Sequence, residues 1–95
     1  MVYSLASIYF KENYTPEVYE EYKKAITPVI AKYNGRYVIR TNEFEARSEE
    51  WKPDRVVVIE FDTKEDMNSC FMSPEFKAAV RIKNKVAVTR SIIVG

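Results

Sequence analysis

The sequence predicts one α+β domain built from a four-stranded antiparallel sheet, with two helical segments on one of its faces. Three observations lead to this prediction. Residues Val56 to Phe61 are largely apolar on both faces of a strand, which is typical of the centre of a sheet. Thr15 and Ser73 each precede a proline and an acid, the pattern that begins a helix. The second and third strands are too close in the sequence to be joined by a crossover helix.

The first part of the chain predicts a strand followed by a helix. Residues 2–10 are rich in Tyr, Ile, Leu and Phe and contain no strand breaker. From Thr15 onward, apolar residues recur at helical spacing as far as Tyr33. Pro28 lies within this pattern, so we expect a kink or a loosened turn there. The pair Asn34-Gly35 supplies the left-handed stop that ends the helix.

The remaining elements complete a β-α-β-β-α-β order. Residues 36–41 predict the second strand, and residues 43–46 are a candidate continuation of it. A polar loop leads to the third strand, after which Thr63 begins a second helix that restarts at Ser73. Residues 89–94 predict the last strand. Right-handed crossovers then give the ferredoxin-like plan, with the first and third strands at the centre of the sheet.

The third strand also predicts how the protein assembles. One of its faces carries Arg55, Val57, Ile59 and Phe61, and the other carries Val56, Val58 and Glu60. Two helical segments can cover only one face of the sheet, and a bare apolar face would be an unusually large patch on a monomer. We therefore expect a two-fold homodimer with the sheets packed face to face.

Composition narrows the classes of function. The 95 residues suit one domain, residues 1–95, and the formal charge of +1 argues against a nucleic-acid binder. Histidine is absent, which removes His-based triads, His metal sites and a proximal His for haem, so we predict no metal and no cofactor. A single cysteine, no signal-peptide pattern and no apolar span favour a cytoplasmic protein that does not enter the membrane.

Four stretches in the right order and spacing resemble the family called domain of unknown function 1330. They are Glu20-Glu-Tyr-Lys23, Gly35-Arg-Tyr-Val-Ile-Arg40, Trp51-x-Pro-x-Arg55-Val-Val-Val-Ile-Glu60-Phe61 and Ser73-Pro-Glu-Phe76. The resemblance covers nearly the whole chain and implies the dimeric α+β barrel arrangement, with no established reaction. The chain departs from the family pattern at Thr41-Asn42, where Gly-Gly is common. It departs again at Cys70-Phe71, where a Trp or Tyr is usual.

Glu60 is the first candidate site residue, because it shares a face with Val56 and Val58. Desolvation there would disfavour the ionised carboxylate unless a cation paired with it, so Glu60 could act as a general base or accept a hydrogen bond from a ligand. Simple strand alternation places Arg40 beside Val58 and diagonal to Glu60. The alternative is a structural Arg–Glu pair that fixes the register of the sheet or the dimer.

Trp51 and Arg55 are the other candidate ligand-binding residues. An indole beside a guanidinium could stack on a planar or anionic ligand, since Arg binds carboxylates in bidentate fashion. The alternative is structural: Trp51 would close the hairpin loop over the core, and Arg55 would pair with Glu49, Glu50 or Asp54 of that loop. No residue is assigned a catalytic role.

Tyrosines and basic residues give weaker signals. We expect three tyrosines in the core beneath the first helix: Tyr19, Tyr22 and Tyr33. Three others lie on strands, where they could line a cavity or pack the sheet: Tyr3, Tyr9 and Tyr37. Cys70 is expected to be a small inert hydrophobe. The basic residues of the last third predict a solvated helix face, with a phosphate or RNA contact as the alternative: Lys77, Arg81, Lys83, Lys85 and Arg90.

These observations leave three functions open. The first is a homodimer that binds a small molecule in a pocket at the sheet. The second is a cofactor-independent enzyme, similar to an oxygenase or an isomerase, that uses Glu60 or a tyrosine; this rests on analogy with other dimeric α+β barrels. The third is a structural module whose sheet serves only to dimerise. The sequence alone does not decide whether the protein is an enzyme.

Overall fold

The computed structural model describes all 95 residues and contains a ferredoxin-like α+β fold. The expected order of elements is confirmed, and the second helical segment consists of two helices, α2 and α3. In chain order the elements are β1 (Val2–Phe10), α1 (Pro16–Lys32), β2 (Gly35–Thr41), β3 (Arg55–Phe61), α2 (Lys64–Met72), α3 (Pro74–Asn84) and β4 (Ala87–Val94). None of the three helices has the length and apolar character that a membrane-spanning helix requires.

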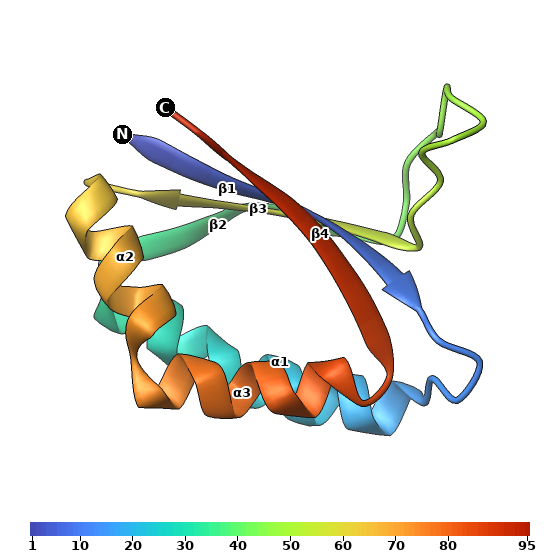
Figure 1. Cartoon of the computed structure of the whole chain (residues 1–95), viewed down its shortest axis with the longest axis horizontal. Coiled ribbons are helices and arrows are strands. Elements are labelled where there is room, and N and C mark those ends of the chain that lie inside the picture. Colours follow the sequence, from blue (N-terminus) through green and yellow to red (C-terminus); the bar gives the residue numbers. More distant parts are fainter.

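The four strands form one antiparallel sheet in the order β2-β3-β1-β4, with β1 and β3 at its centre as the sequence predicts. All three helices lie on one side of this sheet (Figure 1). We call the side that faces the helices the inner face and the opposite side the outer face. The N- and C-termini lie close together at one end of the two neighbouring strands β1 and β4 (Figure 1).

Side-chain caps begin all three helices at the hydroxyl residues that the sequence indicates. The hydroxyl oxygens of Thr15, Thr63 and Ser73 accept hydrogen bonds from backbone N–H groups three residues later. These bonds satisfy donors that have no partner within the helix. Helix α1 continues through Pro28 as one element.

At the end of α1, Asn34 and Gly35 have different roles, although the sequence pattern treats them as a pair. Asn34 adopts the left-handed conformation, with φ 63°, whereas Gly35 does not. Gly35 is needed for packing, because a Cβ there would lie 2.7 Å from the Phe61 ring and 2.8 Å from a methyl carbon of Ile30. Phe61 and Ile30 are among the fully buried side chains of the core. This glycine therefore allows β2 to approach the core closely.

An irregularity at Val38 decides which β2 side chains reach the helices. Arg36 pairs with Glu60 across the strands, but beyond Val38 the register shifts, so that Ile39 pairs with Val58 and Arg40 with Val57. The extra residue reverses the facing of all later side chains. Arg40 therefore lies on the inner face, whereas uninterrupted alternation would place it on the outer face.

Strand β2 ends at Thr41, and the expected continuation over residues 43–46 is wrong. The Thr41 hydroxyl accepts a hydrogen bond of 2.9 Å from the backbone N–H of Glu43. This local bond competes with strand pairing and turns the chain away from the sheet. Residues 42–54 then form a loop that projects beyond the sheet, on the side away from the helices (Figure 1).

Candidate functional site

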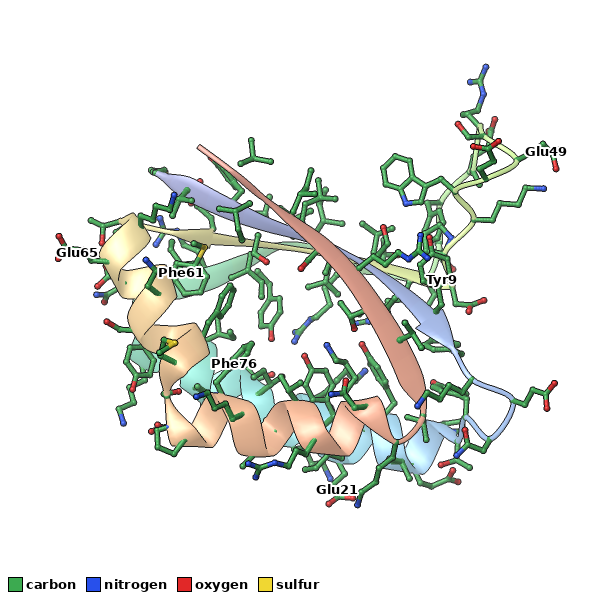
Figure 2. All side chains as sticks on the ribbon, in the orientation of Figure 1. Tyr9, Glu21, Glu49, Phe61, Glu65 and Phe76 are labelled. Carbon is green, nitrogen blue, oxygen red and sulfur yellow. The ribbon has the colours of Figure 1, made fainter.

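A cavity of about 250 Å³ lies between the inner face of the sheet and helices α1 and α3. Twelve of its nineteen lining residues are hydrophobic, and none is acidic. Four are cationic: Lys23, Arg40, Arg55 and Lys83. Figure 2 shows side chains from the sheet and the helices pointing into the space between these layers, with Phe76 of α3 among them. The cavity is therefore an apolar chamber with four cations in its wall, of which only Lys23 has a carboxylate partner, Glu20 outside the lining.

Arg55 opens β3 and points inward, in agreement with the predicted alternation. It is 8% exposed, and its Nη1 donates a hydrogen bond of 2.9 Å to Asn42 Oδ1. Its Nε is buried and has no partner, while the guanidinium lies 5.5 Å from the centre of the Tyr19 ring. The expected ion pair with a loop acid is wrong. Glu49 lies at the far end of the projecting loop, away from the inner face (Figure 2).

Lys83 is buried in the wall of the same cavity, so the expectation that it lies on a solvated helix face is wrong. It is 7% exposed, and its Nζ lies 5.3 Å from the centre of the Tyr22 ring. Desolvation is the only cause of its perturbed pKa, which falls to about 8. An ammonium group loses hydration on burial and gains no compensating anion here. The amine is therefore far easier to deprotonate than an ordinary lysine.

Arg40 lies at the exposed rim of the cavity and does not contact Glu60. Its guanidinium stacks over the Tyr37 ring at 4.1 Å, and its Nη1 is 3.4 Å from the hydroxyl of Thr27. The expected position beside Val58 and Glu60 is wrong, because the register shift at Val38 turns Arg40 to the opposite face. Arg40 and Arg55 thus line one cavity, although the sequence pattern does not pair them.

Three tyrosines, Tyr19, Tyr22 and Tyr37, line the cavity next to these cations. The rings of Tyr19 and Tyr22 are in an edge contact at 5.3 Å between centres. Burial raises the pKa of all three phenols, most strongly for Tyr22, and the nearby arginines only partly oppose this. The phenols therefore remain protonated at neutral pH and can donate hydrogen bonds within the cavity.

Two buried polar atoms of the cavity wall lack a hydrogen-bond partner. They are Nε of Arg55 and the hydroxyl oxygen of Thr89, which belongs to β4. Unpaired buried donors are rare in folded proteins and carry a desolvation penalty of about 1–3 kcal/mol each. A hydrogen-bonding ligand atom or an ordered water beside either group would remove that group's penalty.

Glu60 lies on the outer face, away from the cavity, and its partners are complete. It accepts a hydrogen bond of 2.6 Å from the Tyr3 hydroxyl and an ionic one of 2.8 Å from Arg36 Nε. Arg36 also contacts Asp62 at 2.9 Å. The hydrogen bond from Tyr3 and the charge of Arg36 outweigh desolvation and lower the pKa of Glu60. Glu60 is thus held ionised, which does not favour a general base at neutral pH.

Trp51 also belongs to the outer face. Its indole Nε1 donates a hydrogen bond of 2.8 Å to the hydroxyl of Ser7, while the side chain remains half exposed. Ser7 pairs with Val56 across the sheet, so both point away from the helices. The candidate clamp formed jointly by Trp51 and Arg55 is therefore wrong, because the sheet separates the two side chains. Trp51 instead lines a second cavity of about 350 Å³ beneath the loop.

Comparison with known families matches the model described as a domain of unknown function (DUF1330) over residues 2–95. The chain belongs to the DUF1330 family. A search of curated proteins found no match. Solved structures share the fold at low identity. A protein of unknown function from Rhodopseudomonas palustris aligns with a TM-score of 0.78 at 17% identity, over 98% of this chain and 79% of that one.

Two further solved structures resemble this DUF1330 chain. A dimeric ferredoxin-like protein of unknown function from Thermobifida fusca aligns with a TM-score of 0.75 and 15% identity, over 99% of this chain and 89% of that one. SnoaB, described as a cofactor-independent oxygenase from Streptomyces nogalater, aligns with a TM-score of 0.70 and 14% identity, over 99% and 90% of the two chains. At such identities the likeness supports the fold alone.

Sequence reasoning missed Lys83 in this DUF1330 chain, although a signal for it was present. The inward positions of α3 include Phe76 and Ala79, and Lys83 follows them by seven and four residues. Residues at this spacing share one face of a helix. A lysine in register with an apolar stripe is thus a candidate buried cation. Lys83 was instead grouped with exposed basic residues such as Lys77, so its place on the apolar face of α3 was overlooked.

Proposed function

We propose that the protein binds a small organic anion in the inner cavity, and that it does so as a homodimer joined through the outer face of the sheet. The observation that carries the ligand proposal is the presence of two buried cations, Arg55 and Lys83, in a cavity wall that contains no carboxylate. Buried charge is normally paired within the protein. A ligand carboxylate would supply the absent charge and accept the free hydrogen bond from Arg55 Nε.

The rest of the cavity favours a ligand with an apolar body. Most lining residues are hydrophobic, and aromatic rings come from α1, β2 and α3. Such walls with a few convergent polar groups are typical of small-molecule sites. Arg40 at the rim, stacked on Tyr37, could contact a second polar group of the ligand. An aromatic or branched aliphatic carboxylate has both features that the cavity offers.

The dimer is supported by the exposed hydrophobic side chains of the outer face. Ile39, Val88, Ile92 and Val94 are each more than 40% exposed, and Val58 lies at the centre of this face on β3. A contiguous apolar surface on a soluble domain typically marks an interface. The Thermobifida fusca structure, which shares the fold, is described as dimeric. A second copy would bury this face through self-complementary contacts.

The cavity favours a ligand-binding protein over a module that only dimerises. A structural dimer gains nothing from unpaired cations on the face opposite its interface, and such groups reduce stability. An enzymatic role similar to that of the oxygenase SnoaB is the second candidate. In this chain it would depend on Lys83 or the cavity tyrosines, because Glu60 lies on the outer face with a lowered pKa.

The ligand proposal can be tested by thermal unfolding with matched pairs of acids and their neutral amides. We expect benzoate, phenylacetate and 3-phenylpropanoate to raise Tm in a saturable way, whereas the corresponding amides leave it unchanged. Arg55→Met should abolish the shift, and the control Lys77→Met, on the solvent side of the same α3 that carries Lys83, should keep it. Equal shifts with acids and amides, or no shift with any acid, would contradict the proposal.

A further inference from the structure

Lys83 has the surroundings of a reactive amine rather than those of a simple anion-binding cation. Its side chain is almost completely buried and lines the inner cavity, where its Nζ lies over the Tyr22 ring, 5.3 Å from the ring centre. No carboxylate lines the cavity to hold the ammonium form. Burial without a counterion favours the neutral amine, which is the nucleophilic form of lysine.

The cavity brings this amine into one cluster with Arg55, a group that stays cationic. Arg55 enters from β3, where it lies over Tyr19, whereas Lys83 enters from α3 and lies over Tyr22. The two rings touch, with centres 5.3 Å apart, so both cations belong to one polar cluster. A guanidinium that binds a carboxylate in bidentate fashion can therefore fix one end of a ligand while the amine reaches another.

We infer that Lys83 forms an imine with the carbonyl group of an oxo acid held in the inner cavity. This inference rests on the proposed function, because the carboxylate of the oxo acid is the anion assigned to Arg55. It adds a covalent site and a chemical class of ligand: a carboxylic acid with a ketone or aldehyde group and an apolar body.

The reaction is a reversible condensation that needs no oxidant or reductant. The neutral amine of Lys83 adds to the carbonyl carbon, and one of its protons moves to the carbonyl oxygen. The carbinolamine hydroxyl then takes a proton from solvent and leaves as water, so that a C=N bond replaces the C=O bond. The product iminium is cationic, and the ligand carboxylate would offset its charge within the cavity. The apolar walls limit the access of water that would reverse the reaction.

The lowered pKa of Lys83 is consistent with this chemistry. A pKa of about 8 leaves on the order of a tenth of Lys83 neutral at pH 7, roughly 300 times the fraction for a lysine at its ordinary pKa of 10.5. The intrinsic nucleophilicity of the amine falls somewhat as its pKa falls, so the gain in rate is smaller than the gain in neutral fraction. We therefore expect the imine to form on Lys83 at least about tenfold faster than on any exposed lysine.

Reductive trapping with the 95-residue protein tests the inference. The protein is incubated at pH 7.5 with phenylpyruvate, reduced with sodium cyanoborohydride, and analysed by intact mass and peptide mapping. We expect one adduct per chain, located on Lys83, and we expect an excess of 3-phenylpropanoate, which lacks the oxo group, to suppress it at least tenfold. Lys83→Arg should lose the adduct while keeping a cation, and Lys77→Met should keep the adduct.

The outcomes separate this inference from the proposal that supports it. If phenylpyruvate and 3-phenylpropanoate both raise Tm but no adduct forms on Lys83, the imine is overturned and anion binding stands. Adducts spread over exposed lysines, without protection by 3-phenylpropanoate, would also overturn it. The absence of both shifts and adducts would overturn the two proposals together. The protection experiment uses the unmodified protein, so a failure of Lys83→Arg to fold would not prevent the test.

Discussion

The two faces of the sheet differ in how their charged side chains are paired. On the outer face, Glu60 is surrounded by donors: it binds the Tyr3 hydroxyl and Arg36, which in turn contacts Asp62. On the inner face, Arg55 has a single neutral hydrogen-bond partner and one free donor, and Lys83 has no anion. The outer network is thus complete within one chain, whereas the inner cluster is incomplete without another molecule.

This difference indicates where function is to be sought. A satisfied ion network on a strand needs no ligand to explain it, and its contribution to stability is modest when it is exposed. Unpaired buried cations lower stability, and a protein retains them where they serve binding or catalysis. The outer face also carries exposed hydrophobic residues, which the proposed dimer would bury. Three substitutions and one pH series test this contrast between the two faces.

The largest effect is expected from a charge at the centre of the outer face. Val58→Asp would place a charge from each copy in the interface of the proposed dimer, removed from water. Like charges across an interface are unfavourable by several kcal/mol, so the dissociation constant should rise at least roughly a thousandfold. Sedimentation equilibrium should then show monomers.

Ala78→Asp is the matched control, because it makes the same change on an exposed position of α3. It should leave the dimer unchanged. If Val58→Asp and Ala78→Asp behave alike, the outer face of the sheet is not the interface.

Lys83→Met tests the inner face. Removing the amine while keeping most of the side-chain volume should stabilise the free protein by about 2–3 kcal/mol, because the buried ammonium is unpaired. The same change should weaken binding of organic anions and remove the borohydride-trapped adduct. Urea unfolding measures the first effect and ligand titration the second. Lys77→Met should change neither, and a destabilised Lys83→Met variant would show that the ammonium has a partner.

The pH dependence of this stability difference tests the buried ammonium in a second way. The pKa of Lys83 is about 8 in the folded protein and about 10.5 when unfolded. The folded state therefore carries the full penalty of the ammonium below pH 8 and loses it as the pH rises from 8 to 10.5. The advantage of Lys83→Met over the wild type should shrink across this window.

Comparing the two proteins at each pH removes the contribution of other groups that titrate in the same range. Burial raises the pKa of Cys70 to about 11, so its titration lowers the stability of both proteins at high pH. Urea unfolding at pH 6.5, 8 and 9.5 suffices. A difference between the variants that stays constant over this range would contradict the assigned pKa of Lys83.

Sequence patterns predicted the fold well because each element depends on local signals. Hydroxyl caps, proline positions and the alternation of β3 act over a few residues, and the structure confirms them. Pairing across the sheet was predicted only where the strands are regular. The register shift at Val38 has no strong sequence mark, such as a glycine, and it moved Arg40 from the outer face to the inner one. One extra residue thus separated Arg40 from Glu60.

The candidate site was predicted in part, for a related reason. Arg55 was assigned to the correct face, but its surroundings depend on α1 and α3, which lie far from it in the sequence. Helical spacing indicates that Lys83 is buried, but lysine is so seldom buried that its residue type predicts exposure to solvent. Trp51 and Arg55 are close in the sequence and lie on opposite faces. Tertiary neighbours, which no local pattern encodes, decide which of these residues share a site.

The smallest effect is expected from Glu60→Gln on the outer face. The amide keeps an acceptor for the Tyr3 hydroxyl but loses its charge opposite Arg36, so stability should fall by less than the gain from Lys83→Met. Because the lowered pKa of Glu60 favours folding only while the carboxylate is ionised, the difference from the wild type should vanish as the pH falls through that pKa. Glu45→Gln, which removes a largely exposed ion pair with Arg47, is the control and should have no effect. Anion affinity should be unchanged in both variants, and a tenfold loss in Glu60→Gln alone would connect the outer network to the cavity.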